Sequence, residues 1–502
     1  MAAFYYVPLG VDGGLYSYPA LSLSRDGDPG ESQITVEELQ GIHGVKVSYG
    51  FDLSRTVRVV PMSMWFRIFG ADIWSARIFG LTEMLLLLVI SFVVFHGISG
   101  NGRVAMLCWL IYSTDSVVLA LGSTELRPDI MVTIFTLIVF LCINADDKFY
   151  GKREYVIISL SAVLSTFLLA LTHITAAVSL ALLVSYILAE FLLSWKAVSV
   201  YRKWLGASVI TTGVITFLMR REFFALFVPT HYPDRSPFSP AVDVEGGIRS
   251  LVSGGVWPIV QKEYTRWVDY FLPFNPAVFL AVLLAVFLFG LGIFKHRHIK
   301  RLHQQLSILV GCAAACMVLA LDPKPWSFHA LPVVPFLIIV LANQLKLMDN
   351  LRMKNIAVFL LFALIVLSAG TKLALGGRIV LKSAQNGYSN MELIDLMTRI
   401  LDDKDKDYLI VGSTGIWPYI HPATNVVIFD AKPARMPELK KYLSEIDCIL
   451  IDKDYKGYNW VSCFETMYPE VYLKQMESIG KEEGGWPFMK GLKPVSRDMG
   501  CS

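Results

Sequence analysis

Charged side chains are scarce along this chain. Only 17% of its 502 residues are Asp, Glu, Lys or Arg, whereas 54% are hydrophobic. Soluble proteins carry about 25% charged residues, and the mean hydropathy of this chain is +0.52. The shortage of charge argues against an ordinary soluble protein and indicates one that crosses a membrane.

Several sequence signals of other protein classes are also missing. The net charge of +3 gives no basic field for nucleic acid. The seven cysteines lack the spacing of a zinc site or a disulfide framework. GSTG (412–415) lacks the lysine and the spacing of a phosphate loop. No signal peptide or hydrophobic anchor stands before Asp12.

Long apolar runs fill the middle of the chain. About ten of them reach or approach the roughly 20 residues that span a bilayer. The predicted spans are 78–96, 103–122, 128–144, 154–172, 174–194, 204–222, 276–294, 305–321, 329–345 and 356–376. We therefore predict an α-helical polytopic membrane protein. Its transmembrane region covers 78–376, including an outer loop at 223–275, and follows an extracytoplasmic first loop with juxtamembrane helices at 1–77.

The connections between these runs differ in charge. Lysines and arginines collect on alternate connections, for example KHRHIKR (295–301) and KLMDNLRMK (346–354). The positive-inside rule makes that side cytoplasmic. The other side then receives 1–77, 123–129, 172–173, 223–275, 322–329 and 377–502. Arg220 and Arg221, at an outer helix end, are the exception. Any chemistry is expected on the extracytoplasmic face.

The tail, residues 377–502, has a mixed polar pattern. Predicted strands are YLIVGS (408–413), NVVIFD (425–430) and CILID (448–452), and predicted helices are MELIDLMTRILDD (391–403) and MPELKKYLSEID (436–447). Strands alternating with helices indicate a small α/β domain. Cys448 and Cys463 either pair as a disulfide outside the cell, or Cys448 is a buried free thiol.

An acid-bearing stretch, GVDGGLYSYPALSLSRDGDPGES (10–32), precedes the apolar region. We predict a polar loop here. Glycine flanks Asp12, so a ligand can approach the backbone closely, and the carboxylate can act as a general base on a hydroxyl or amine. The alternative is an ordinary Asp-Gly turn.

The segment STELRPDI (123–130) carries Glu125, Arg127 and Asp129 at the start of a predicted span. Ionisable groups at a membrane edge are costly without partners, so this segment is a candidate functional cluster. An aspartate in the first turn also favours the helix dipole, so a plain capping role for Asp129 stays open.

Further candidates lie at the predicted outer ends of other spans. They are His173, Arg77 just before the first span, and Lys324 and His329 in DPKPWSFHALPVVP (322–335). Cations at this level can bind a lipid phosphate. They can also simply anchor helix ends at the membrane interface, and a lone histidine often has a structural role.

Taken in order, these pieces resemble the GT-C glycosyltransferases, in particular the branch of protein O-mannosyltransferases and the lipid A aminoarabinose transferase. The matching pieces are Asp12 with GGLYSYPALSLSRDGDP (13–29), IFGADIWSARIFG (68–80), Arg127-Pro128-Asp129, Thr172-His173 and HALPVVP (329–335). The resemblance covers nearly the whole chain. It departs at Gly13, where the family often has a second acid. The family also has a span before the acid loop, so we expect the natural start to lie upstream.

The resemblance implies a GT-C-like fold with a small C-terminal extracytoplasmic α/β domain, in the plasma or inner membrane. It implies an inverting glycosyltransferase that moves a sugar from polyprenyl phosphate to a lipid, glycan or protein acceptor. Asp12 would be the base, with Glu125, Asp129 and His173 beside the acceptor. The cations implied to hold the leaving phosphate are Arg77, Arg127, Arg220, Arg221, Lys324 and His329. A divalent metal ion is left open.

A lipid or solute transporter, or a flippase, is the alternative. Transporters tend to place ionisable groups at mid-membrane on broken helices, often within internal repeats. Here such groups cluster at one face, with Glu83, Asp115 and Glu190 deeper, and no repeat is evident. A non-catalytic sensor that binds a ligand through its tail would not require acids ordered along separate loops.

Overall fold

The computed structural model describes most of the bundle and parts of both flanking regions. The described residues are 11–26, 45–48, 56–115, 118, 126–145, 152–173, 175–196, 198–220, 255–272, 275–295, 299–321, 327–347, 351–385, 390–401, 407–412, 414–421, 424–430 and 448–449.

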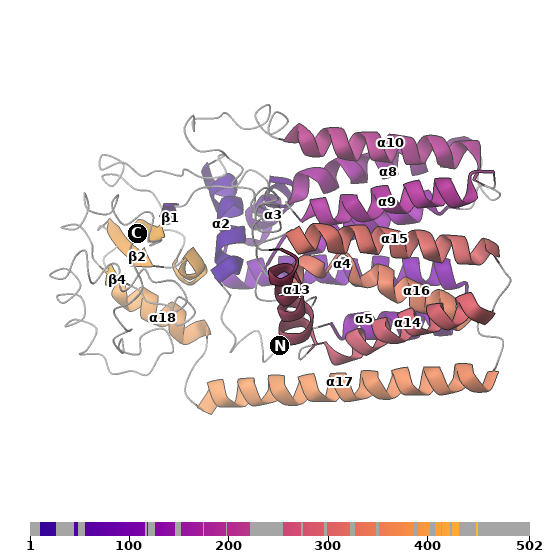
Figure 1. Cartoon of the computed structure of the whole chain (residues 1–502). Helices are drawn as coiled ribbons and strands as arrows, with labels where there is room; N and C mark the ends of the chain where they lie inside the picture. The colour runs from indigo at the N-terminus through magenta and orange to yellow at the C-terminus, as the bar shows by residue number, and fades with distance from the viewer. Residues whose placement is uncertain are drawn as a thin grey trace.

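A bundle of long helices forms the middle of the molecule (Figure 1). Its helices are α4 (Ile73–Ser99), α5 (Gly102–Ser113), α7 (Asp129–Ile143), α8 (Lys152–Thr172), α9 (Ala176–Ser194), α10 (Val200–Leu218), α14 (Pro276–Lys295), α15 (Ile299–Leu321), α16 (Val334–Leu347) and α17 (Leu351–Gln385). Each predicted span corresponds to one of them. Among the described residues, five helices are long and apolar enough to cross a membrane. The predicted helical membrane fold is confirmed.

Some helix ends differ from the prediction. α4 begins at Ile73 because Asp72 caps it, its side chain accepting a hydrogen bond from the Ser75 backbone N–H at 2.7 Å. Arg77 therefore lies inside the first span rather than before it. α16 begins at Val334, because the 3₁₀ helix η6 (Ser327–Ala330) precedes it and carries His329.

Close helix contacts in the bundle depend on small residues. At Gly311 of α15, a Cβ would lie 2.7 Å from the backbone oxygen of Leu182 in α9. The missing side chain lets these two helices approach closely, as is common between membrane helices. Large side chains such as Leu85 and Leu160 are exposed on the outside of the bundle. A lipid environment would cover them.

Two helices lie across the end of the bundle, between it and the small sheet: α2 (Val11–Asp26) and α3 (Thr56–Phe69) (Figure 1). The polar loop predicted at residues 10–32 is wrong for the described part, Val11–Asp26, and Asp12 lies within this helix and not in the alternative Asp-Gly turn. This segment is helical because Tyr18, Ala20 and Leu21 are buried in one hydrophobic cluster.

The sheet has four described strands, β1 (Val45–Ser48), β2 (Tyr408–Gly412), β3 (Val426–Asp430) and β4 (Cys448–Ile449), in the order β1-β3-β2-β4. All pairings are parallel. Helix α18 (Asn390–Ile400) and the 3₁₀ helix η7 (Thr414–Tyr419) pack beside the sheet. The three predicted strands of the tail are found, together with the helix predicted at 391–403. The helix predicted at 436–447 and Cys463 lie outside the described residues.

A hydrophobic core separate from that of the bundle joins the N-terminal segment to the tail. Trp417 of η7 is 1% exposed. It makes edge contacts with Tyr18 of α2 at 6.4 Å and Phe66 of α3 at 6.2 Å between ring centroids. Strand β1 also comes from the N-terminal segment. The predicted division into 1–77, 78–376 and 377–502 stays a prediction.

Candidate active site

Arg127 and Asp129 form a buried ion pair where α7 begins. The Arg127 Nε donates to Asp129 Oδ2 at 3.0 Å, and the two side chains are 3% and 0% exposed. The preceding residue, Leu126, is buried with φ of 49°. Non-glycine residues with this backbone conformation are strained and concentrate at functional sites. Arg127, the next residue, donates to Asp129 in the first turn of α7.

His173 reaches the same carboxylate from the connection between α8 and α9. Its Nδ1 lies 3.8 Å from Asp129 Oδ1. The same nitrogen lies 2.9 Å from the Thr175 hydroxyl and accepts from the Thr175 backbone N–H at 3.4 Å. The histidine is 4% exposed. These contacts orient the imidazole ring, so His173 is held in place rather than free to rotate.

His329 adds a third basic side chain. It is 2% exposed in η6 and interacts electrostatically with Asp129. One buried carboxylate is thus surrounded by Arg127, His173 and His329, from segments far apart in the sequence. The cluster combines one guanidinium, which is always charged, with two imidazoles that can each donate through a ring N–H, so it can accommodate an anion in a medium of low dielectric constant. We call these four residues the Asp129 cluster.

The remaining predicted cations are placed differently. Arg77 is 1% exposed and interacts electrostatically with Tyr419 of η7, where the bundle meets the tail. Arg220 follows the end of α10, with its guanidinium carbon 4.5 Å from the centre of the Phe217 ring. Asp12 lies in the first turn of α2, but its side chain is outside the described part. Glu125, Arg221 and Lys324 also lie outside the described residues.

A second buried ion pair has no counterpart in the sequence prediction. Arg58 of α3 donates to Glu83 of α4 through Nη2 at 2.7 Å and through Nε at 3.0 and 3.1 Å. Both side chains are nearly inaccessible, at 2% and 8%. Glu83 is one of the deep acids of the sequence, and a carboxylate within an apolar run implies a cationic partner. Nothing in the sequence identifies Arg58 as that partner, because it lies on a separate helix.

Arg266 is another residue that the sequence does not reveal. It is 0% exposed, lies in the π-helix η5 (Thr265–Phe271), and has its Nη2 3.5 Å from Glu263 Oε1. The π-helix follows α13 (Trp257–Tyr264) and contacts η6, which carries His329. π-helical turns occur often at functional sites. Their geometry has no simple sequence pattern, so this buried arginine could not be found in advance.

Within the described part of the chain, no group of three His, Cys, Asp or Glu side chains is placed to hold a metal ion. The side chains of Asp12 and Glu125 lie outside that part. The Asp129 cluster contains one carboxylate, which is already paired with the Arg127 guanidinium, so it does not suit a divalent cation. The possible metal requirement stays a prediction.

No family model and no curated protein matches the chain. Solved structures do. ArnT from Cupriavidus metallidurans bound to undecaprenyl phosphate matches with a TM-score of 0.50 and 13% identity, over 88% of this chain and 85% of that one. The oligosaccharyltransferase of Archaeoglobus fulgidus, in a complex with Zn and sulfate, matches with a TM-score of 0.52 and 12% identity, over 94% and 68%.

Both similar proteins are GT-C glycosyltransferases. At this identity the likeness establishes the arrangement of helices and not the reaction. It agrees with the ordered motifs in the sequence and with the helices that are apolar enough to cross a membrane. The chain is a multi-pass membrane protein with the GT-C fold.

Proposed function

We propose that this protein is an inverting membrane glycosyltransferase that uses a sugar linked to polyprenyl phosphate. The observation that carries the proposal is the Asp129 cluster: a buried carboxylate surrounded by Arg127, His173 and His329, in a chain with the GT-C fold. This arrangement supports binding of an anionic leaving group. The polyprenyl phosphate that leaves the sugar is such an anion.

The donor side of the reaction is assigned to the cations. As the bond between the sugar and the phosphate oxygen breaks, negative charge grows on the phosphate. Preorganised donors aimed at developing charge supply a large part of catalysis. Arg127 and His329 are the donors that the cluster supports best, with Arg77, Arg220, Arg221 and Lys324 as the further candidates. ArnT was solved with undecaprenyl phosphate bound, which supports a donor of this class.

The acceptor side is assigned to Asp12. Its carboxylate takes the proton from an acceptor hydroxyl or amine, and the acceptor oxygen or nitrogen forms a bond to the anomeric carbon. The bond to the phosphate oxygen breaks on the opposite face, so the configuration inverts and polyprenyl phosphate leaves. Asp12 lies in the first turn of α2, where the helix dipole favours the charged form of a carboxylate.

Glu125, Asp129 and His173 are proposed to line the acceptor side of the same site. Asp129 also has a second role, because its contact with Arg127 fixes the direction of the guanidinium. A positioned donor loses less entropy when the substrate arrives than a mobile one does. Asp129 is therefore proposed to act partly as a positioning residue.

The site is proposed to face the extracytoplasmic side of a plasma or inner membrane. The charges of the loops support this orientation, because lysines and arginines collect on the alternate connections that lie at the other end of the bundle. The acceptor would be a lipid, glycan or protein of the cell envelope, and the 223–275 connection and the tail are the regions proposed to select it.

The test is sugar transfer by the purified full-length protein in proteoliposomes, with polyprenyl-phosphate sugars as donors and envelope extract as acceptor. Mass spectrometry of envelope glycans and glycolipids, with and without the gene, identifies the product. Asp12→Asn is expected to lower the transfer rate by a factor of about 10² to 10⁴, the usual contribution of a general base. Asp26→Asn, at the other end of the same helix, is the matched control and should keep the rate.

If Asp12→Asn transfers sugar at the wild-type rate, Asp12 is not the general base, but the proposed glycosyltransferase activity is unaffected. A wild-type protein that transfers sugar to no envelope acceptor would remove the proposed function itself.

A further inference from the structure

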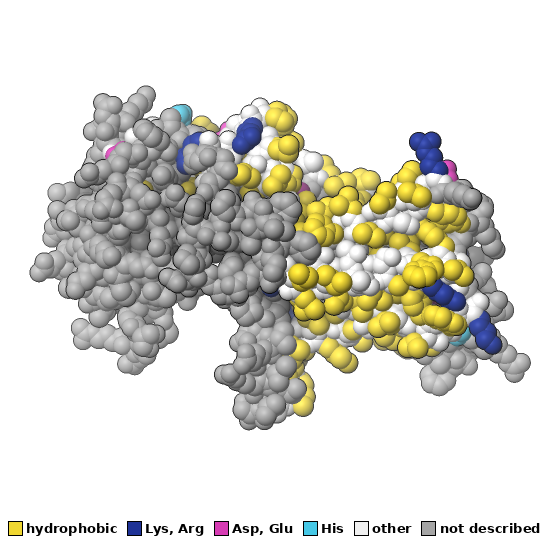
Figure 2. Space-filling view, turned by 90° about the horizontal axis from the view of Figure 1, so that it is seen from above, with side chains coloured by type: hydrophobic (Ala, Val, Ile, Leu, Met, Phe, Trp, Pro, Cys, Tyr) yellow, Lys and Arg dark blue, Asp and Glu magenta, His cyan; other side chains and the backbone are white. Residues whose placement is uncertain are grey.

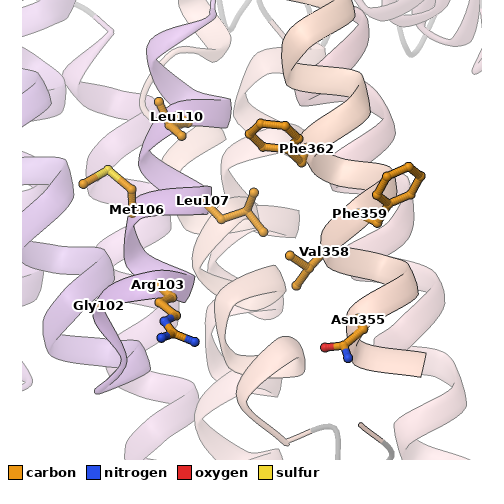
Figure 3. Close-up of a pocket in the computed structure, with 9 residues that line it drawn as sticks. All are labelled: Gly102, Arg103, Met106, Leu107, Leu110, Asn355, Val358, Phe359 and Phe362. Atoms are coloured by element: carbon orange, nitrogen blue, oxygen red, sulfur yellow. The ribbon is translucent and has the colours of Figure 1, made fainter. Parts of the chain in front are cut away.

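An apolar groove lies between α5 and α17 (Figure 3). Its lining residues are near the starts of both helices, at the end of the bundle away from the sheet. Its volume is about 710 Å³. The apolar lining comes from Met106, Leu107 and Leu110 on α5 and from Val358, Phe359 and Phe362 on α17. On each helix these residues follow the spacing of a single face. One face of α5 therefore lies opposite one face of α17, and the space between the two faces forms the groove.

One end of the groove is polar. Figure 3 places Gly102 and Arg103 of α5 at this end, with Asn355 of α17 across the groove from them, and Leu110 and Phe362 at the other end. Lys346 lies nearby, because its Nζ is 3.3 Å from the backbone oxygen of Ile98, just before α5 begins. Figure 2 shows the opposite face of the bundle, the α10 side, where Lys and Arg side chains also lie at the end away from the sheet. The groove thus has an apolar lining along most of its length and a basic side chain, Arg103, at one open end, which we call its mouth.

Helix α17 contacts α5 and α14 but is mostly exposed. In the most apolar stretch of this helix only 22% of the residues are buried, compared with 50% in the corresponding stretch of α4. Further along, towards the sheet, Lys372 of α17 donates to Asn275 Oδ1 at 3.5 Å and interacts electrostatically with Asp115, which follows α5. This polar contact joins α17 to the bundle at Lys372, which lies nearer the sheet than the groove does.

We propose that the groove binds one anionic glycerophospholipid, with an acyl chain along the apolar lining and the phosphate beside Arg103. Its depth suits this occupant. Each lining face covers about two helical turns, roughly 10 Å, which is less than half of the ~30 Å hydrocarbon core. A membrane-spanning helix would need contacts along the whole depth, whereas a lipid of one leaflet does not.

The charge at the mouth selects the head group. An exposed arginine at the membrane surface attracts anionic lipids, which are enriched in the cytoplasmic leaflet. Arg103 lies at the end that the positive-inside rule assigns to the cytoplasm. The groove is also remote from the Asp129 cluster, because Leu126 beside that cluster packs into the hydrophobic core next to the sheet, whereas the groove lies near the starts of α5 and α17. The lipid is thus a structural ligand and not the sugar donor.

The test is native mass spectrometry of the full-length chain, extracted gently from vesicles of phosphatidylcholine that contain a minor share of phosphatidylglycerol. The wild type is expected to retain a single phosphatidylglycerol. Arg103→Gln should lower that retention about fivefold, the effect of one basic residue at the surface. Met106→Trp should block the groove and abolish retention. Arg153→Gln and Leu160→Trp, both exposed on α8, are the matched controls and should behave like the wild type.

Equal retention of phosphatidylglycerol by wild type, Arg103→Gln and Met106→Trp would overturn the proposal. So would a wild-type protein that retains no phosphatidylglycerol, or one in which polyprenyl phosphate in the same vesicles displaces it. A second copy of the chain that occupies the groove, seen as a dimer that Met106→Trp abolishes, would also overturn it. Unfolding temperatures measured in parallel confirm that each variant is folded.

Discussion

At the scale of single residues, buried charges distinguish this protein from a simple bundle of apolar helices. A buried carboxylate pays a large desolvation cost, which only a well-placed cation can offset. Arg58 donates hydrogen bonds to both carboxylate oxygens of Glu83, and Arg127 donates one to Asp129. The first pair joins α3 to α4, whereas the second lies within one segment beside two histidines. We therefore expect the first pair to affect mainly stability and the second to affect mainly activity.

Glu83→Gln tests the structural pair. It leaves the Arg58 guanidinium buried without its counter-charge, so the free energy of unfolding should fall by about 3–5 kcal/mol. Unfolding of the purified protein in detergent measures this change. Replacing both residues by methionine removes both charges and should restore most of the loss. A double variant as unstable as Glu83→Gln would show that packing, and not the unpaired charge, is responsible.

Arg127→Gln tests the Asp129 cluster. Loss of one preorganised donor to a developing oxyanion should lower kcat/KM for the polyprenyl-phosphate sugar by a factor of about 10² to 10³. Arg127→Lys should restore little, because lysine lacks the rigid planar group that bonds Asp129. Arg153→Gln, an exposed cation on α8, is the control. If Arg127→Gln retains the wild-type kcat/KM while remaining folded, the cluster has no part in catalysis.

At the scale of elements, the bundle depends on close approach between helices. α9 and α15 pack where Gly311 lies against the backbone of Leu182. Membrane helices cannot use the hydrophobic effect to associate within lipid, so tight van der Waals contact has a larger share in their stability. A single methyl group at that position would force the two helices apart.

Gly311→Ala should therefore destabilise the protein by about 1–3 kcal/mol, the usual effect of overpacking. Thermal unfolding in detergent measures the change. Gly290→Ala is the matched control, because a Cβ at Gly290 of α14 has nothing within 4 Å. Alanine also favours the helix more than glycine does, so the control should be neutral or slightly stabilising. Equal losses for the two variants would contradict the contact between α9 and α15.

The elements that the sequence predicts well are those with a strong local signal. Each span follows from an apolar run, and β2 and β3 follow from short buried runs between polar segments. Helix α2 is not predicted because glycines and Pro19 suggest a loop, while the burial of Tyr18 and Leu21 that stabilises it is a tertiary contact. Strand β1 is not predicted because its partner β3 is several hundred residues away.

The Asp129 cluster is predictable in part for a related reason. Arg127, Asp129, His173 and His329 stand at the ends of apolar runs, so alternation of the spans assigns them to one end of the bundle. Their distances from one another could not be predicted, because these depend on packing of the bundle. Arg58 and Arg266 have no comparable signal, since neither lies at the end of a predicted span.

At the scale of the whole molecule, two hydrophobic cores stabilise different parts of the chain. The larger core lies within the bundle, and the smaller one joins α2, α3 and η7 to the sheet. Segments from opposite ends of the sequence thus form one unit beside the Asp129 cluster. This arrangement places α2, which carries Asp12, between the bundle and the tail (Figure 1).

Trp417→Ala tests the separation of the two cores. Loss of a buried tryptophan costs about 3–5 kcal/mol, and here the loss should fall on the smaller core. Hydrogen exchange should accelerate in β2 and β3 while α9 and α15 keep their protection. Trp204→Ala, at a position that is 72% exposed, should leave both regions unchanged. Faster exchange throughout the bundle in Trp417→Ala would show that the protein has a single cooperative core.

The most direct test of the central claim is transfer of sugar from a polyprenyl-phosphate donor to an envelope acceptor, followed by mass spectrometry of the product. The account predicts that the wild-type protein and the Arg153→Gln control form an inverted product, and that Arg127→Gln forms it at least about a hundredfold more slowly. A wild-type protein that binds the donor but never breaks its sugar–phosphate bond, or that moves the intact lipid across the membrane, would contradict the account.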